Sequence, residues 1–339
     1  MSIKPSTQSP TTAASEAPPS SAEGTFLDAI RAALRDALLE DERTFVLGED
    51  VGHFGGAFGV TKGLWEELGD ERILDTPISE EGFVGAAIGA AWMGERPIVE
   101  LQFADFVSCP FDSIVTVAAK THWRSGIALP LVIRAPFGGG VSGGPFHSQC
   151  PEGWFVGVAG LKVVAPGSVA DAYGLLRAAI EDEDPVLYFE HKGLYRRLRG
   201  ELPEPSYRTP LGRATVARPG RDATVVTYAA GVDLALRASE DLDVEVLDLR
   251  TLWPYDADAV LASLEKTSRL LVLQEAPRSG GVAGHLLSLV SREGFELLDA
   301  PPALVAPPDT PVPFAPSLEQ AYLPSVESLR AGLEELLAY

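Results

Sequence analysis

The sequence is poor in cysteine and has no long apolar run. Cys109 and Cys150 are the only two cysteines among 339 residues, and no CxxC or Cys/His ligand spacing surrounds them. Neither a disulfide framework nor a structural zinc site is therefore indicated, and a reducing, cytoplasmic compartment fits best. The longest uncharged run of small and apolar residues, from Gly82 to Gly94, spans 13 residues, which is too short to cross a bilayer.

Basic side chains are also scarce relative to acidic ones. The chain has 27 Lys plus Arg against 48 Asp plus Glu, which gives a formal net charge of −21. Proteins that bind nucleic acid or anionic membranes usually do so through basic surfaces. The sequence therefore predicts neither nucleic acid nor membrane as a partner. Its length and an apolar content of 46% are sufficient for two soluble globular domains.

Two segments have a strongly biased composition. Residues 1–24 are rich in Ser, Thr and Pro and contain no aromatic residue, so we expect a disordered N-terminal arm. This arm has neither the apolar stretch of a signal peptide nor the arginines of a transit peptide. The passage from Asp299 to Pro316 carries seven prolines, so we expect it to run extended before a last helix, Val326–Leu337.

Between these segments, helical and strand patterns alternate, which is typical of a parallel α/β sheet. Apolar residues recur at helical spacing from Phe26 to Leu38, and buried-type strand runs follow, among them RPIVELQF, LPLVIRAP and PVLYFE. The alternation stops in the passage LRGELPEPSYRTP and restarts with ATVVTYA. We therefore predict an α/β domain over residues 25–205 and a smaller α/β domain over residues 206–339.

A glycine-rich segment, GGGVSGG, runs from Gly138 to Gly144 and matches two motifs at once. These are the dinucleotide pattern GxGxxG and the nucleophile elbow GxSxG, centred on Ser142. Both need a helix directly after the loop, whereas Pro145 and more loop residues follow here. We therefore favour a plain glycine loop, with a serine hydrolase as the alternative. His147, at the end of the loop, is either a proton-transfer group or a structural histidine.

The stretch DTPISEEGFVGAAIGAAWMG predicts a helix that begins after Ser79 and presents a face of small residues. Such a face lets another helix approach closely. Glu80 lies at the positive end of the helix dipole, where an ionised carboxylate is stabilised. From its position alone, Glu80 is either a simple helix-start anion or a carboxylate that is kept charged for a chemical purpose.

Several blocks, taken in order, resemble one enzyme family. They include LGEDVG, DTPISEEGFVGAAIGAA, ELQFADF, FHSQCPEGWF and, further on, VEVLDLRTLWPYD. These blocks resemble the beta subunit of the thiamine-diphosphate-dependent 2-oxo acid dehydrogenases, over nearly all of Phe26 to Tyr339. The resemblance implies a transketolase-like pyrimidine-binding α/β domain with a parallel sheet, followed by the smaller α/β transketolase C-terminal domain. It agrees with the two alternating regions.

The resemblance also implies roles for single residues. Glu80 would hydrogen-bond the aminopyrimidine N1′ of thiamine diphosphate and so promote removal of the cofactor's C2 proton. Phe106 would stack on the pyrimidine ring, with Gln102 nearby. His147 would face the reacting centre and either hydrogen-bond the substrate carboxylate or serve in acyl transfer to lipoamide. Glu81 falls outside the motif and is expected at the surface or in an interface.

The EDEDP turn resembles the loop that holds a structural potassium ion in this family, mostly through carbonyl oxygens. The ligands that this resemblance implies are Leu131, Ala179, Ile180, Asp182 and Asp184. The alternative is an acidic helix end that leads into a strand, because backbone ligands leave little trace in a sequence.

The family's motif for magnesium and diphosphate, GDG followed by Asn, is absent from the sequence. The resemblance therefore implies that half of the active site, with most of the magnesium ligands, belongs to an alpha subunit in an α2β2 heterotetramer. The small-residue face after Glu80 would meet a neighbouring subunit. The C-terminal domain would dock the subunit-binding domain of the dihydrolipoyl acyltransferase, whose lipoyl domain accepts the acyl group.

The substrate class remains open between three types. ELQFADF and GLYR resemble branched-chain enzymes, whereas DTPISE, AAKT and HSQC fit pyruvate or acetoin enzymes equally well. We expect oxidative decarboxylation of a 2-oxo acid of the branched-chain type, with pyruvate or acetoin as alternatives. A scaffold subunit without catalysis is the alternative from another class. Loss of Glu80 or His147 would be expected of such a scaffold, and both residues are present.

Overall fold

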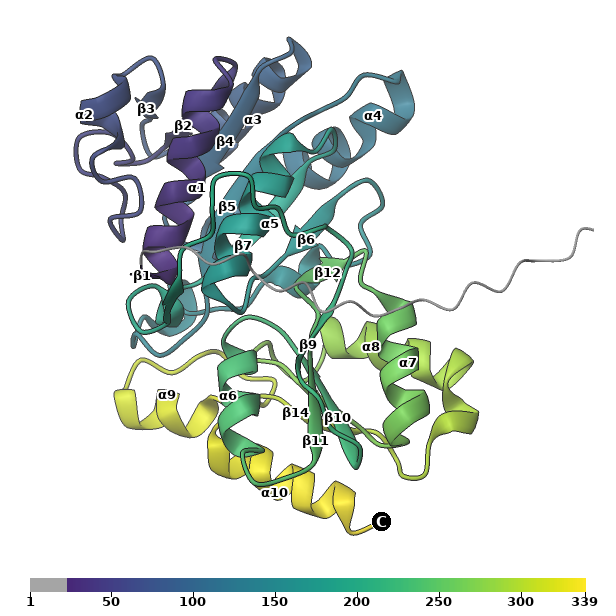
Figure 1. Cartoon of the computed structure of the whole chain (residues 1–339). Coiled ribbons are helices and arrows are strands. Elements are labelled where there is room, and N and C mark those ends of the chain that lie inside the picture. The colour runs from purple at the N-terminus through teal and green to yellow at the C-terminus, as the bar shows by residue number, and fades with distance from the viewer. Residues whose placement is uncertain (1–22) are drawn as a thin grey trace, which may run out of the picture.

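The computed structural model describes residues 23–339, which form two α/β domains, one above the other (Figure 1). The predicted arm lies outside the described residues except for Glu23 and Gly24. With Thr25 these two form strand β1 (Glu23–Thr25), which pairs antiparallel with β8 (Arg199–Glu201). The prediction of disorder is therefore wrong for these two residues. Among the residues described, no helix has the length and apolar character needed to span a membrane.

The first domain is built on a seven-stranded sheet. In spatial order its strands are β12 (Thr251–Trp253), β6 (Lys162–Val164), β7 (Val186–His191), β5 (Val132–Phe137), β4 (Arg96–Glu100), β2 (Thr44–Gly48) and β3 (Ile73–Asp75). All neighbours are parallel except β12 and β6, which are antiparallel. Strand β12 comes from the second half of the chain, so the two domains are joined through a shared sheet as well as by the linker.

Helices cover both faces of this sheet, as the continuous apolar runs of its strands require. Helices α1 (Phe26–Glu40) and α5 (Val169–Glu181) pack on one face. Helices α3 (Glu80–Trp92) and α4 (Ala119–Ser125) pack on the other, and a π-helical turn over Ser113–Ala118 leads into α4. A short helix, α2 (Leu64–Leu68), lies before β3. The strand residues alternate between the two layers: Val46, Ile98 and Val132 face α1 and α5, and Leu47, Val99 and Ile133 face α3 and α4.

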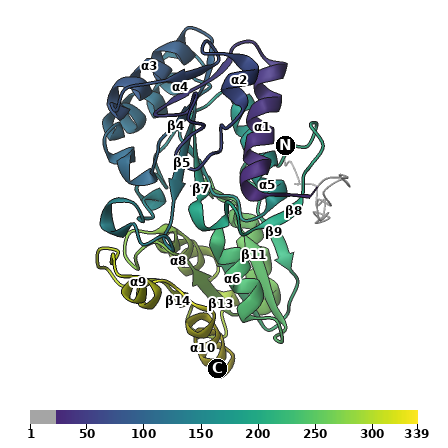
Figure 2. The same cartoon turned by 90° about the vertical axis from the view of Figure 1, so that its left-hand side faces the viewer.

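The second domain has a five-stranded sheet, parallel except for one edge. In spatial order its strands are β14 (Ala303–Val305), β13 (Leu270–Leu273), β10 (Ala223–Thr227), β11 (Val244–Asp248) and the antiparallel β9 (Thr215–Arg218). Helices α6 (Ala230–Ala238) and α10 (Val326–Leu337) cover one face, and α7 (Ala257–Thr267) and α8 (Val282–Glu293) cover the other. In Figure 1 α6 lies to the left of these strands and α7 and α8 lie to the right, and Figure 2 views the domain from the side of α6. The bounds predicted for the last helix are confirmed.

The proline-rich passage contains a strand and leads into a short helix, neither of which was predicted. Its residues Ala303–Val305 form strand β14, which adds to the sheet edge beside β13. Helix α9 (Pro316–Tyr322) follows, with Pro316 in its first turn, where the missing amide hydrogen costs nothing. The passage therefore brings α9 to the junction of the two domains (Figure 1).

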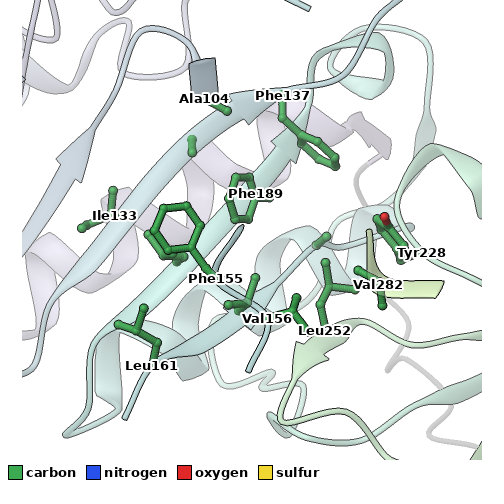
Figure 3. Packing of buried hydrophobic residues seen from close by; sticks show 14 of the residues in the cluster. Ala104, Ile133, Phe137, Phe155, Val156, Leu161, Phe189, Tyr228, Leu252 and Val282 are labelled. Carbon is green, nitrogen blue, oxygen red and sulfur yellow. The ribbon is translucent and has the colours of Figure 1, made fainter. Parts of the chain in front are cut away.

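One apolar core continues from the first domain into the second. Figure 3 shows Phe155 and Phe189 of the first domain close to Tyr228, Leu252 and Val282 of the second. Phe155, Phe189 and Val282 are completely buried. Close-packed interiors resist sliding. The shared core therefore fixes the position of the second domain relative to the first, and so relative to any site at their junction.

Candidate active site

The residues predicted to bind thiamine or substrate follow neighbouring strands at one edge of the first sheet. Glu80 follows β3, Gln102 and Phe106 follow β4, and His147 follows β5. In open α/β sheets, ligands bind outside the carboxyl ends of the strands, where the strand order reverses. Here the order reverses between β2 and β4, because β3 extends the sheet on one side of β2 and β4 on the other.

A pair of carboxyl groups lies at this reversal. Glu80 is half-buried and is the first residue of α3. Glu49 directly follows β2 and is almost fully buried. Burial raises the pKa of Glu49 above its ordinary value, and the negative charges of Glu80 and Asp50 raise it further. Glu49 Oε1 has no hydrogen-bond partner among residues 23–339, so this atom is free to bind a polar group of a ligand.

Glu49 is not among the predicted site residues, although the sequence carried a signal for it. Two carboxylates in LGED directly follow a buried strand, and such residues collect at the carboxyl edge of a parallel sheet. The second of them, Asp50, accepts a hydrogen bond from Gln102 Nε2 at 3.0 Å. The structure therefore brings Gln102 to the same reversal point as Glu49.

An aromatic cluster surrounds His147. The ring centroid of His147 lies 4.6 Å from that of Phe103 and 5.7 Å from that of Phe106, both in edge-to-face geometry. The ring centroid of Phe58 lies 5.3 Å from that of Phe103. The structure thus places His147 beside Phe106, together with Phe103 and Phe58, which are not among the predicted site residues.

A buried lysine lies behind this cluster. Lys192 follows β7, and its Nζ lies 5.6 Å from the centroid of the Phe103 ring. Burial lowers the pKa of Lys192 below its ordinary value, while Asp105 acts in the opposite direction. Within the described chain, neither Lys192 Nζ nor Asp105 Oδ2 has a hydrogen-bond partner. Sequence alone gave no reason to single out this lysine, since only the fold brings it next to Phe103.

The predicted potassium loop is occupied by basic side chains. Arg96 Nη1 donates to the backbone oxygens of Ile180 and Asp182 at 2.9 and 3.2 Å. Lys162 Nζ lies 2.6 and 2.7 Å from the Asp182 carboxylate oxygens and 3.1 Å from Asp184 Oδ2. The backbone oxygens of the remaining candidates, Leu131 and Ala179, accept from the amides of Val186 and Asp182. These basic side chains favour the alternative reading, an acidic helix end that leads into a strand, and the potassium site stays a prediction. No group of three or more His, Cys, Asp or Glu side chains in residues 23–339 could hold a metal ion.

The comparisons with known proteins agree with this architecture. The model of the transketolase pyrimidine-binding domain matches residues 23–197, and that of the transketolase C-terminal domain matches residues 212–329. A split-gene transketolase, solved as an inactive beta4 tetramer, has a TM-score of 0.76 and 21% identity over 93% of this chain and 98% of its own. This structure shows the same fold.

Three curated relatives are similar over almost their entire length. The 2-oxoisovalerate dehydrogenase subunit beta of Bacillus subtilis is 43% identical over 322 residues, 93% of this chain and 98% of its own. The pyruvate dehydrogenase E1 component subunit beta of Staphylococcus epidermidis is 43% identical over 92% of this chain and 99% of its own. The beta subunit of an acetoin:2,6-dichlorophenolindophenol oxidoreductase of Bacillus subtilis is also 43% identical, over 91% and 96%. With both domain models matched in order, this chain belongs to the beta subunits of the thiamine-diphosphate-dependent 2-oxo acid dehydrogenases, oxidoreductases of transketolase-like fold.

Proposed function

We propose that this chain supplies half of the active site of a decarboxylase component that acts on a branched-chain 2-oxo acid. The other half belongs to an alpha subunit, in an α2β2 heterotetramer, and the acyl group passes to lipoamide on a dihydrolipoyl acyltransferase. The observation that carries this proposal is the gathering of Glu80, Phe106 and His147 at the carboxyl edge of one sheet.

The residues at this edge fit thiamine diphosphate. When bound, the cofactor supplies the electron sink for loss of carbon dioxide from a 2-oxo acid. Glu80 would accept a hydrogen bond from the aminopyrimidine ring, and the unpaired Glu49 Oε1 would be available to a second polar group. The half-buried ring of Phe106 offers an apolar face to the pyrimidine. Magnesium is held mainly by the alpha subunit, because the GDG motif is absent from this sequence.

The branched-chain assignment rests on the surroundings of His147. Its imidazole hydrogen-bonds the substrate carboxylate or takes part in acyl transfer, while Phe58, Phe103 and Phe106 form an apolar wall beside it. Such a wall suits an aliphatic side chain better than it suits a polar one. The named relatives act on 2-oxoisovalerate, pyruvate and acetoin at equal identity, so the choice among these substrates requires an assay.

Reconstitution tests this function. The isolated chain is expected to be inactive, and co-expression with a cognate alpha chain should give decarboxylation that requires thiamine diphosphate and magnesium, with reduction of added lipoamide. One methylene in an apolar pocket changes kcat/KM by about 10- to 200-fold, so 2-oxoisovalerate should exceed pyruvate and acetoin by at least about tenfold. Robust decarboxylation by the isolated chain would refute the shared site, and a preference for pyruvate or acetoin would reassign the substrate.

A separate variant tests the subunit contact at α3. Gly82, Gly85 and Gly89 are exposed, and a side chain added at Gly85 or Gly89 would meet no atom within 4 Å. Gly89→Leu should therefore leave the thermal midpoint of the isolated chain unchanged or slightly raised, since glycine costs about 1 kcal/mol in a helix. It should prevent co-purification with the alpha chain, because Leu blocks the close approach of another helix.

The matched control is Ala262→Leu, which adds bulk at an exposed position of α7 in the second domain. It should assemble as the unmodified chain does, as judged by size-exclusion chromatography of the co-expressed pair. Normal assembly of Gly89→Leu would show that the small-residue face is not the contact.

A further inference from the structure

The loop that carries His147 has little internal support. It runs from Gly138, at the end of β5, to Gln149, and the Gly138 amide donates to the Gln149 oxygen at 3.2 Å. Inside it, the Gly143 amide donates to Ser148 Oγ at 3.2 Å, and a 3-10 turn spans Gly144–Phe146. No helix follows Ser142 directly, so the elbow geometry of a serine hydrolase is not formed.

A carboxylate from the second domain binds this loop. Glu319 lies on α9 and is only 4% exposed. Its Oε1 accepts from the amides of Gly140 and Ser142 at 3.1 and 3.2 Å. Its Oε2 accepts from the Ser142 amide at 2.9 Å and from Ser142 Oγ at 3.2 Å. Hydrogen bonds to an ionised acceptor are roughly twice as strong as neutral ones. The Glu319 side chain alone therefore holds the loop at Gly140 and Ser142.

The backbone at Ser142 is strained in the conformation that binds Glu319. Ser142 adopts φ of 55°, in the left-handed region that residues other than glycine avoid. Gly140 has φ of 82°, which glycine adopts freely. Together these two conformations aim both amides at the Glu319 carboxylate. Without that acceptor, nothing in the hydrogen bonds of the loop would offset the strain at Ser142.

Two more groups of the second domain contact the same loop. Glu275, which lies just after β13, accepts from the Gly139 amide at 2.5 Å and also contacts His191 Nε2 at 2.9 Å. Burial alone would raise the pKa of Glu275, but His191, the Gly139 amide and Lys192 outweigh it and lower the pKa to about 2. The Phe314 ring lies against Gly144, where an added Cβ would come within 2.4 Å of it. The second domain therefore contacts the loop at Gly139, Gly140, Ser142 and Gly144.

Space beside the loop makes these contacts necessary. A cavity of about 340 Å³ is lined by Gly139, Gly140, Glu275 and Leu323, among others. Side chains do not fill this volume, so on that side the apolar contacts of the loop are limited to those of Leu323 at Gly139 and Phe314 at Gly144. If the carboxylates ceased to hold the amides, the loop would have room to shift, and His147 would move relative to the Phe103 and Phe106 rings.

We infer that Glu319 is a positioning residue, through which the second domain holds the glycine loop and places His147 against Phe103 and Phe106. This inference rests on the proposed function only where it assigns a catalytic role to His147. Glu319 itself contacts neither substrate nor cofactor. The second domain then contributes to turnover by holding the loop, in addition to any docking role. Glu275 and Glu319 together bind three loop amides and the Ser142 hydroxyl.

The test uses Glu319→Gln, which keeps the size of the side chain and removes its charge. In the reconstituted complex, kcat should fall about tenfold, because the hydrogen bonds of the loop change from charged to neutral ones. His147→Ala should lose more, and the double variant Glu319→Gln/His147→Ala should be no slower than His147→Ala alone. The control is Glu334→Gln, an exposed carboxylate of α10 that pairs with Arg330, and it should match the unmodified complex.

A second measurement does not depend on activity. The chain has five histidines, so histidine-selective NMR of the full-length chain gives few ring signals, and His147→Ala identifies the one from His147. Glu319→Gln should shift this signal, whereas Glu334→Gln should not. An unmoved His147 signal together with normal kcat would overturn the inference, as would a double variant whose losses simply multiply.

The two hypotheses can fail separately. If the reconstituted complex is inactive on every 2-oxo acid tested, the proposed function fails, and the NMR signal of His147 alone decides whether Glu319 positions the loop. If the complex is active and neither the signal nor kcat responds to Glu319→Gln, the loop is held by other contacts.

Discussion

Replacing Glu80 with Gln is expected to lower kcat of the reconstituted complex by about 10²- to 10⁴-fold, the range typical of a lost proton-transfer group. Glu80 is half-buried at the start of α3, at the positive end of the helix dipole. An amide of the same size can still hydrogen-bond a ring nitrogen, but it cannot stabilise the proton there. Glu80→Gln should therefore lose the proton-transfer step but keep the binding of thiamine diphosphate and the fold.

The measurement combines turnover with two readouts that do not require it. Size-exclusion chromatography should show an unchanged tetramer, and exchange of the C2 hydrogen of bound thiamine diphosphate with deuterium should slow in proportion to kcat. The matched control is Glu327→Gln, since Glu327 is also an acidic residue in the first turn of a helix, α10, but an exposed one in the second domain. Near-normal turnover of Glu80→Gln would remove Glu80 from the mechanism.

The adjacent glutamate, Glu81, lies in a different environment from Glu80. It is exposed, and its Oε1 accepts from Ser113 Oγ at 2.7 Å rather than turning toward Glu49. The expectation that Glu81 lies at the surface therefore holds for this chain. Only Glu80, of the two adjacent glutamates, shares the electrostatic environment of Glu49.

The fold could be predicted from the sequence because its signals are local. Alternating helix and strand patterns predicted parallel α/β sheets, and the first and last helices begin at Phe26 and Val326 because Thr25 and Ser325 cap them. The pairing of β12 with β6 could not be predicted, because it joins segments about 90 residues apart and depends on how the two domains pack. The same applies to β14: proline content predicted an extended passage but not its pairing with β13.

The site was predictable where a motif lies within one short segment. Glu80, Gln102, Phe106 and His147 all belong to such segments, and the fold brings each to the same sheet edge. The partners of these residues are not local. Glu49 and Glu80 are brought together from two strands, and Glu319 reaches Ser142 from another domain. Contacts of this kind depend on tertiary geometry, which a local sequence pattern does not predict.

The potassium prediction shows the same limit from the opposite direction. The acidic turn was visible in the sequence, but the positions of Arg96 and Lys162 were not, since they come from the starts of two other strands. The structure directs both cations at Asp182 and the backbone oxygens around it. A turn for which the family resemblance implied a potassium site is thus contacted in this structure by the protein's own basic side chains.

The sheet beneath the site contains a buried charge cluster, and Arg134→Leu is expected to destabilise the chain by about 3–5 kcal/mol near pH 8. Arg134 is fully buried on β5. Its Nε and Nη2 donate to the two oxygens of Glu190 at 2.6 and 2.8 Å, and its Nη1 donates to Glu100. Removing the only guanidinium in this contact leaves two carboxyl groups inside the sheet without their cation.

The pH dependence of this effect follows from Glu100. Burial raises the pKa of Glu100, and Arg134 opposes that rise. Without Arg134 the folded-state pKa rises further above the unfolded value, so the stability of the variant is retained below the unfolded pKa and is lost as the pH rises. Urea unfolding should therefore show a larger deficit against the unmodified chain at pH 8 than at pH 5.

Two further variants decide whether the uncompensated charge is the cause. Arg35→Leu breaks a pair with Glu67 in which both side chains are more than a third exposed, and it should leave the urea midpoint nearly unchanged. The triple variant Arg134→Leu, Glu100→Gln, Glu190→Gln removes the buried charges together and should recover part of the loss at pH 8. If Arg134→Leu is equally destabilised at both pH values and the triple variant recovers nothing, lost packing rather than charge accounts for the effect.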